Sequence, residues 1–189
     1  MDDHAGAVIF GGPMSANDTD TFIRQETDWI EVPLREEKPF LCVCLGAQML
    51  SRHLGGTVTP CPDASIEVGY YPLEVSAAGQ ALCDWPDHVY QWHTEGFSVP
   101  ETATHLAGAG RFPNQAMSYG PAAAGVQFHP EITYALVNRW TMSRPDRLVT
   151  KGARPRLEHF ENHFRHAAAV GAWLEAFLPR LLRAKFAAA

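Results

Sequence analysis

The chain has 189 residues, a formal net charge of −6 and 46% hydrophobic residues, which is enough for one well-buried core. This apolar fraction excludes a disordered chain, and the lack of any Gly or Pro repeat excludes a fibrous one. The negative charge argues against nucleic acid as a partner, and no apolar run reaches the length of a membrane span. No export leader is recognisable, so we expect a cytoplasmic protein whose cysteines are free thiols.

Strand-like and helical segments alternate in the first half of the chain. Residues 6–10 and 40–43 are short apolar runs of the kind that forms buried strands. A helix is expected between them, with a kink or a restart at Pro33. A second helix is expected over residues 45–54, followed by two glycines that end it. This alternation predicts parallel strands in a layered α/β fold.

The middle of the chain changes to short strands separated by Gly and Pro, which predicts antiparallel strands inserted into the α/β domain. These strands are expected at residues 57–75, 88–93, 97–99, 104–108, 115–119 and 123–128. Helices return near residues 132–142 and 156–184. In the last helix His159, His163 and His166 share one face, where a transition metal could bind. Neighbouring apolar residues instead favour histidines at the edge of a solvated surface.

The strongest local signal is Cys44, which lies where a buried strand gives way to a helix. A tight turn at this place, allowed by the small Gly46, pushes a nucleophile out of the sheet toward a substrate. The N-terminus of the following helix favours a thiolate over a thiol. We therefore predict a cysteine nucleophile; the alternative is a small buried apolar side chain. We expect the other three cysteines to be structural or incidental.

The second signal is the pair His129 and Glu131, which directly follows a predicted strand. Residues two apart on an extended segment point the same way, so the carboxylate can hold the imidazole. His129 can then take and return a proton while Glu131 stabilises its cationic form. Cysteine, histidine and a carboxylate are the minimum set for acyl transfer through a thioester. A hydrogen-bonded surface pair is the alternative interpretation.

The third signal is the loop at Gly11 and Gly12, which follows the first predicted strand. A glycine loop can present bare backbone N–H groups to a developing oxyanion, and the Leu45 N–H beside the nucleophile is a natural second donor. The alternative is a simple turn. All three signals lie at the C-terminal ends of predicted strands, which is the edge where α/β sheets form their sites.

Together, these motifs resemble the class I (triad) glutamine amidotransferases, most closely the stand-alone proteins similar to the glutaminase domain of GMP synthase. The matching stretches are residues 8–13, 38–41, 44–48, 91–93 and 126–131. The resemblance implies a three-layer α/β sandwich of flavodoxin-like type with a mostly parallel central sheet. It also implies that glutamine loses its side-chain amide through a γ-glutamyl thioester, which releases ammonia for an acceptor.

The resemblance assigns roles to residues of this chain. Cys44, His129 and Glu131 correspond to the catalytic triad, and Gly12 and Leu45 to the oxyanion donors. Substrate binding is expected from Gly11, Gln48 and His93, although His93 could instead only brace the loop that carries the triad. No cofactor and no metal are implied.

The sequence departs from the family pattern in two places. Cys42 stands where the family usually has Gly, and the family begins with a further strand and helix before the first strand seen here. We therefore expect a single domain over residues 1–189 that lacks the usual first strand and helix, with residues 8–10 bordering an exposed sheet edge or a gap.

Three functions stay open at this point. The first is a glutaminase whose synthase or acceptor partner is a separate polypeptide. The second is a γ-glutamyl peptide hydrolase or transferase, which would share the triad. The third is a non-catalytic regulatory or binding homologue, or an inactive fragment.

Overall fold

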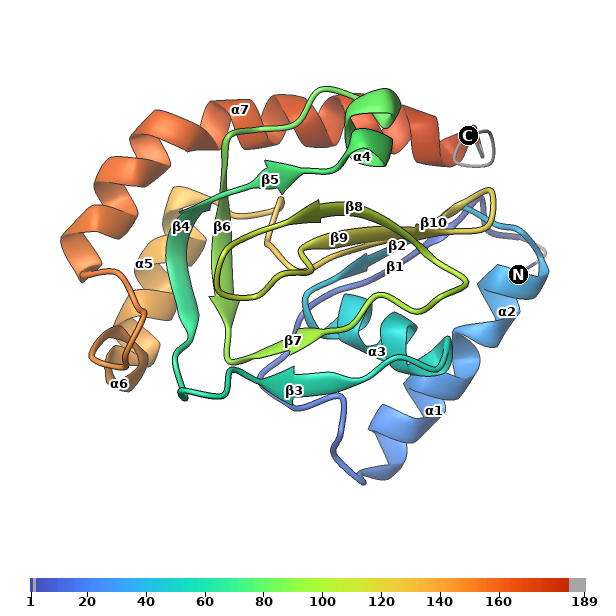
Figure 1. The fold of residues 1–189 in the computed structure, drawn as a ribbon, viewed down its shortest axis with the longest axis horizontal. Helices are drawn as coiled ribbons and strands as arrows, with labels where there is room; N and C mark the ends of the chain where they lie inside the picture. Colours follow the sequence, from blue (N-terminus) through green and yellow to red (C-terminus); the bar gives the residue numbers. More distant parts are fainter. Residues whose placement is uncertain (2, 184–189) are drawn as a thin grey trace.

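The computed structural model describes residue 1 and residues 3–183 (Figure 1). The elements in chain order are β1 (Ala7–Ile9), α1 (Thr21–Trp29), α2 (Glu31–Arg35), β2 (Phe40–Val43), α3 (Leu45–His53), β3 (Val58–Pro60), β4 (Glu67–Pro72), β5 (Glu74–Val75), α4 (Ala77–Leu82), β6 (His88–His93), β7 (Glu95–Phe97), β8 (Thr104–Gly108), β9 (Ala116–Tyr119), β10 (Ala123–Val126), α5 (Tyr134–Ser143), α6 (Pro145–Leu148) and α7 (Arg156–Leu182).

A central sheet with the strand order β1-β2-β10-β9-β8-β5 organises the molecule. Strands β1, β2 and β10 run parallel, whereas β9, β8 and β5 extend the sheet in antiparallel pairs. The ladders β3–β7 and β4–β6 form two separate antiparallel pairs. Helices α1, α2 and α3 lie on one side of the sheet, and α4 and α7 on the other, which gives three layers (Figure 1).

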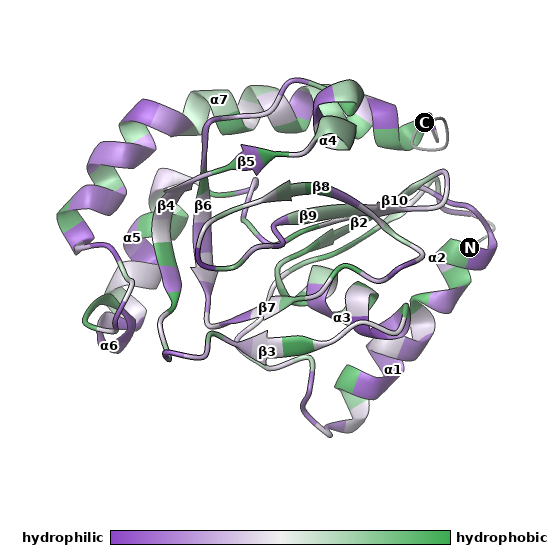
Figure 2. Ribbon diagram, viewed as in Figure 1, coloured by the Kyte–Doolittle hydropathy of each residue, from purple (hydrophilic) through white to green (hydrophobic). Residues whose placement is uncertain are grey.

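The alternation of side chains along β2 divides the core into two halves. Phe40 and Cys42 belong to the cluster under α1 and α3, while Leu41 and Val43 belong to the cluster under α7. Figure 2 shows that β2 is apolar and that the helices on either side of the sheet contain both apolar and polar residues. Burial raises the pKa of the Cys42 thiol, so this side chain is an inert apolar group in a fully buried strand.

Strand β1 lies at the edge of the sheet, where β2 is its one strand neighbour among the described residues. Val8 is 45% exposed and Phe10 is 56% exposed. The predicted exposed edge at residues 8–10 is thereby confirmed. The loop that follows this strand carries Gly11 and Gly12, so a candidate catalytic loop begins at the sheet edge.

Two expectations need correction. The helix after residue 20 breaks at Ile30 rather than at Pro33. Pro33 lies in the first turn of α2, where a backbone N–H has no partner within the helix, so proline is tolerated there. His159 does not edge a solvated surface: it is fully buried, accepts a hydrogen bond from the Tyr90 hydroxyl at 2.9 Å and donates one to the Arg154 carbonyl at 3.0 Å.

Within the described part of the chain, no three His, Cys, Asp or Glu side chains are grouped as a metal site would require. Of the helices that the structure describes, none combines the length and the apolar character needed to cross a bilayer.

Candidate active site

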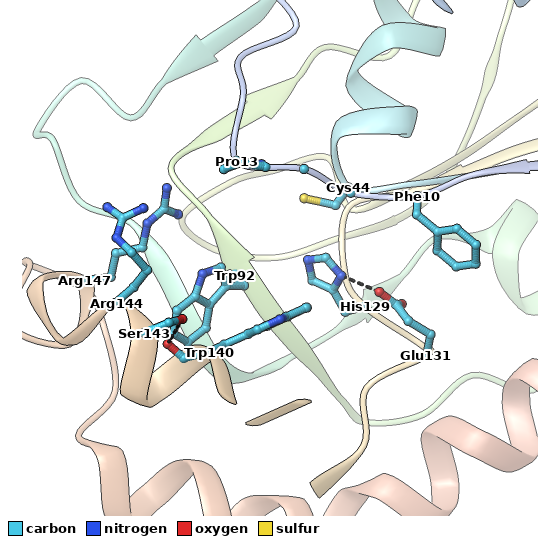
Figure 3. Close-up of a pocket in the computed structure, with 12 residues that line it drawn as sticks. Phe10, Pro13, Cys44, Trp92, His129, Glu131, Trp140, Ser143, Arg144 and Arg147 are labelled. Atoms are coloured by element: carbon cyan, nitrogen blue, oxygen red, sulfur yellow. Dashed lines mark hydrogen bonds and ion pairs between the residues drawn. The ribbon is translucent and has the colours of Figure 1, made fainter. Parts of the chain in front are cut away.

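Cys44 occupies a strained turn between β2 and α3. Its backbone has φ 52° and ψ −108°, an uncommon conformation for a residue with a side chain. The turn is pinned from both sides: the Cys44 N–H donates to the Val126 carbonyl at 2.8 Å, and the Cys44 carbonyl accepts from the Gln48 N–H at 3.0 Å. The thiol thus stands at the N-terminus of α3 and faces a pocket (Figure 3).

Gly46 explains how close α3 lies to the edge strand. A Cβ atom at this position would come within 2.5 Å of the Ile9 carbonyl oxygen and 2.9 Å of the Ile9 Cγ2 atom. Only a residue without a side chain therefore permits this approach of the helix to β1. The contact fixes the first turn of α3, and with it the cysteine, against the sheet.

His129 lies between Cys44 and Glu131 (Figure 3), and residues 130–131 form a turn instead of the predicted extended segment. Its Nδ1–H donates to the Glu131 carboxylate at 2.8 Å, and its backbone N–H donates to the Tyr90 carbonyl at 2.8 Å. The opposite ring nitrogen, Nε2, is buried without a hydrogen-bond partner of ordinary geometry, and the ring interacts with the neighbouring Cys44 side chain. Trp140 packs edge-on against the imidazole at 4.8 Å between ring centroids.

These surroundings change the acid–base chemistry of His129. Burial lowers the pKa of His129, but its interactions with Cys44 and with Glu131 outweigh burial and raise the pKa from 6.5 to about 10. The imidazolium is therefore the favoured form of the His129 side chain at neutral pH. Such a group can give a proton to a leaving nitrogen, which is the task of a general acid.

The thiol, the imidazole and the carboxylate open onto one pocket of about 410 Å³, a size typical of small-molecule sites. Aromatic side chains form its walls, and Trp92 and Trp140 lie 5.6 Å apart between ring centroids. The α5–α6 corner contributes two arginines at the rim (Figure 3). The lining residues are Phe10, Gly11, Gly12, Pro13, Cys44, Trp92, His129, Glu131, Trp140, Ser143, Arg144 and Arg147.

Gly11 and Gly12 lie directly beside the reactive groups. A Cβ atom on Gly11 would come within 3.0 Å of the His129 Cε1 atom and 3.2 Å of the Cys44 Cβ atom. Among the described residues, neither the Gly12 N–H nor the Leu45 N–H has a hydrogen-bond acceptor in the protein. Two free backbone donors near the thiol are what an oxyanion needs, and their assignment to this role stays a prediction.

Gln48 and His93 line a smaller hollow that adjoins Cys44. The Gln48 amide nitrogen donates to the Glu95 carbonyl at 2.8 Å and to the Gln127 side chain at 3.2 Å. Both ring nitrogens of His93 are engaged, with the Glu95 carbonyl at 2.9 Å and the Glu67 carboxylate at 3.1 Å. These side chains therefore brace the hollow from behind, while direct contact with a substrate stays a prediction.

Sequence reasoning did not single out five of the pocket residues: Trp92, Trp140, Ser143, Arg144 and Arg147. Trp92 lies inside the motif at residues 91–93, so the sequence did indicate that it lies near the site. Trp140 lies in the helix predicted over residues 132–142, and Ser143, Arg144 and Arg147 lie between the two predicted helices, where the sequence predicted no element.

Comparisons with known proteins agree with this geometry. A model of the family described as glutamine amidotransferase class-I matches residues 1–138. A glutamine amidotransferase-like protein of Salmonella typhimurium, YfeJ, is 31% identical over 140 residues, which cover 69% of this chain and 58% of that protein. The GMP synthase (glutamine-hydrolyzing) of Bacillus subtilis is 31% identical over 134 residues, which cover 69% of this chain and 25% of the synthase.

Solved structures give the same result. A glutamine amidotransferase from Methylobacillus flagellatus superposes with a TM-score of 0.87 at 26% identity, over 97% of this chain and 78% of that chain. One from Thermotoga maritima has a TM-score of 0.85 at 32% identity, over 96% and 80%. The chain therefore belongs to the class I glutamine amidotransferase family and has its α/β fold, as the sequence motifs predicted. It spans little more than half of the Salmonella relative and a quarter of the GMP synthase.

Proposed function

We propose that this protein is a glutaminase that removes the side-chain amide of glutamine through a thioester on Cys44, with His129 and Glu131 completing the triad. The observation that carries the proposal is the strained turn at Cys44, which holds the thiol beside an imidazole already bonded to a carboxylate at 2.8 Å. All three groups open onto one pocket. Membership of the family supports a glutamine amidotransferase activity in general terms.

The proposed reaction uses each of these groups. The Cys44 thiolate attacks the amide carbon, a carbon–sulfur bond forms, and the Gly12 and Leu45 N–H groups bind the oxyanion. The His129 imidazolium gives its proton to the amide nitrogen, the carbon–nitrogen bond breaks, and ammonia leaves. Neutral His129 then takes a proton from water, whose hydroxide attacks the thioester and releases the γ-carboxyl group and the thiolate.

The acceptor of the ammonia is proposed to be bound outside this domain, by a separate synthase or acceptor subunit. The relatives that carry the name GMP synthase (glutamine-hydrolyzing) are four times the matched length, so this domain corresponds to part of them. The support for a partner rests on those relatives alone.

A second candidate is a γ-glutamyl peptide hydrolase or transferase. The pocket of about 410 Å³ is lined by Trp92, Trp140 and Ser143 in addition to the thiol, which leaves room for a group attached to the γ-amide. Ammonia release from L-glutamine, measured beside amine release from a γ-glutamyl dipeptide, separates the two activities. Glutamine binding without turnover of either substrate would instead favour the regulatory function.

Covalent labelling tests the nucleophile. A diazo-ketone analogue of glutamine is expected to modify Cys44, and peptide mapping by mass spectrometry identifies the labelled thiol. Cys61 is the matched control, because it is more exposed than Cys44 and would react first if accessibility alone decided. The variant Cys44→Ala should lose both labelling and turnover while Cys61→Ala keeps them. Preferential labelling of Cys61, or turnover by Cys44→Ala, would remove the proposal.

A further inference from the structure

The α5–α6 corner places two arginines at the rim of the pocket, beyond the aromatic walls (Figure 3). Helix α5 ends at Ser143, and Pro145 begins α6, so the chain turns at Arg144. This turn directs Arg144 and Arg147 to the same side of the pocket. Neither residue has a role in the chemistry described above.

The two arginines differ in their partners. Arg144 binds the Asp146 carboxylate through two hydrogen bonds, at 2.9 and 2.7 Å, and both side chains are largely exposed. Arg147 is half-buried and has no carboxylate at ion-pair distance among the residues that the structure describes. It lines both the main pocket and the smaller hollow beside Cys44. In the pocket, the charge of Arg144 is thus compensated by Asp146, whereas Arg147 has no such ion pair among the described residues.

The surroundings of Arg147 favour a bound anion. Burial and the neighbouring Arg144 lower the pKa of Arg147, whereas the charges of Asp146 and Cys44 raise it. A partly desolvated cation without a partner is costly, and an anionic ligand relieves that cost. Glu131, the acidic residue of the pocket lining, pairs with His129 through Oε1 and forms no ion pair with Arg147.

A γ-glutamyl substrate supplies such an anion. When its amide carbon lies at the Cys44 sulfur, its α-carboxylate extends several bonds away along the pocket. The planar fork of an arginine matches a carboxylate with two parallel hydrogen bonds. We propose that Arg147 binds the α-carboxylate of the substrate and so selects γ-glutamyl compounds in which this carboxylate is free. This inference rests on the proposed function, because it assumes that the amide binds at Cys44.

A pair of substrates tests the inference. L-Glutaminamide differs from L-glutamine by a neutral amide in place of the α-carboxylate, so it cannot form the proposed ion pair. Arg147→Met should lower kcat/KM for L-glutamine by roughly tenfold to a hundredfold, mainly through KM, and change kcat/KM for L-glutaminamide by less than about twofold. Arg147→Lys should lie between the two, because it keeps the charge and loses the fork.

Arg139→Met is the matched control, since it removes one positive charge from an exposed position of α5 that does not line the pocket. It should leave the preference for L-glutamine over L-glutaminamide unchanged. Retained turnover of L-glutaminamide also shows that the Arg147 variants are folded. An equal loss for both substrates in Arg147→Met, or no loss for L-glutamine, would overturn the inference.

Product binding separates this inference from the proposed function. If the wild-type protein releases no ammonia from L-glutamine, the proposed function fails, and calorimetric titration with L-glutamate then decides the role of Arg147. Weaker L-glutamate binding by Arg147→Met than by Arg139→Met, by tenfold or more, supports the carboxylate site. Equal binding by the two variants, or no binding of L-glutamate by the wild-type protein, refutes it.

Discussion

The substitution Gly11→Ala should reduce catalysis while leaving the fold intact. A methyl group at this position meets the His129 Cε1 atom at 3.0 Å and the Cys44 Cβ atom at 3.2 Å. Ordinary contacts between carbon atoms are about 3.5–4.0 Å, so the imidazole must retreat by roughly 0.5 Å and the cysteine by roughly 0.3 Å. The added carbon therefore disturbs the two reacting groups themselves.

The expected loss follows from these displacements. A misplacement of about 1 Å can cost on the order of a hundredfold in rate, so shifts of this size predict a loss of about tenfold in kcat. The free energy of unfolding should change by less than about 1 kcal/mol, because the movements are a few tenths of an ångström at a pocket with open space. Activity and stability are thus expected to separate in this variant.

Steady-state ammonia release, the rate of Cys44 alkylation by iodoacetamide, and thermal unfolding measure these two effects. Gly171→Ala is the matched control: it adds the same methyl group within α7, where no atom lies within 4 Å, and it should stabilise the helix by up to about 1 kcal/mol without changing kcat. If Gly11→Ala kept kcat within about twofold of the wild-type value, the close approach at Gly11 would not matter for catalysis and the reasoning would be wrong.

Two further variants test the pH dependence and the packing of the site. In Glu131→Gln the loss of the carboxylate should lower the pKa of His129, which in the wild-type protein is raised from 6.5 to about 10. Since the imidazolium donates the proton, the alkaline limb of the kcat profile should move to lower pH; an unmoved limb would contradict this role. The raised pKa of His129 also stabilises the folded protein: this contribution is complete below about pH 6.5 and is lost as pH rises toward 10. The contribution should be smaller in Glu131→Gln. Denaturant titrations at pH 6 and pH 10 measure the free energy of unfolding at both ends of this range. Gly46→Ala should destabilise the protein by about 1–3 kcal/mol and impair turnover, because its Cβ would lie 2.5 Å from the Ile9 carbonyl oxygen; a thermal midpoint equal to that of the wild-type protein would show that α3 can move away at no cost.

The sequence predicted most of the sheet because the strands carry local signals. The bounds of β2, β6 and β8 agree with the prediction at both ends, since each strand is a distinct apolar or alternating run between turn residues. Helix α4 was missed although its signal exists: Ser76 caps it by accepting the Gly79 N–H at 3.1 Å. A short helix in a segment of strands is easily overlooked when each element is read from periodicity alone.

The buried histidine His159 could not be foreseen in the same way. The spacing predicted that His159, His163 and His166 lie on one face of a helix, and all three residues do lie in α7. Its burial depends on the hydroxyl of Tyr90, which comes from a strand far away in the sequence. Hydrogen bonds between distant elements offset the free-energy cost of burying a polar ring. The periodicity of the sequence carries no information about such hydrogen bonds.

Residues of the candidate site likewise differ in whether a local sequence signal predicts their position. Cys44, His129 and Glu131 were predictable because Cys44 directly follows β2 and the other two come three and five residues after the end of β10, and parallel strands end at one edge of the sheet. Arg147 was not, because a turn with three charges and a proline has the composition of any exposed loop. Its place at the pocket depends on how α5 packs, with Trp140 against the His129 ring, and that contact joins residues whose association no local pattern indicates.

The two proposed oxyanion donors are held relative to each other by one contact. Leu45 begins α3, and its neighbour Gly46 lies against Ile9 at the end of β1. Gly12 follows Ile9 by three residues, in the loop after the same edge strand. The helix that carries one donor is therefore pressed directly against the strand that positions the other, so their separation is set before any substrate binds. Preorganisation of this kind is what makes backbone donors effective, and it gives the glycine at position 46 a catalytic consequence although it touches no reacting atom.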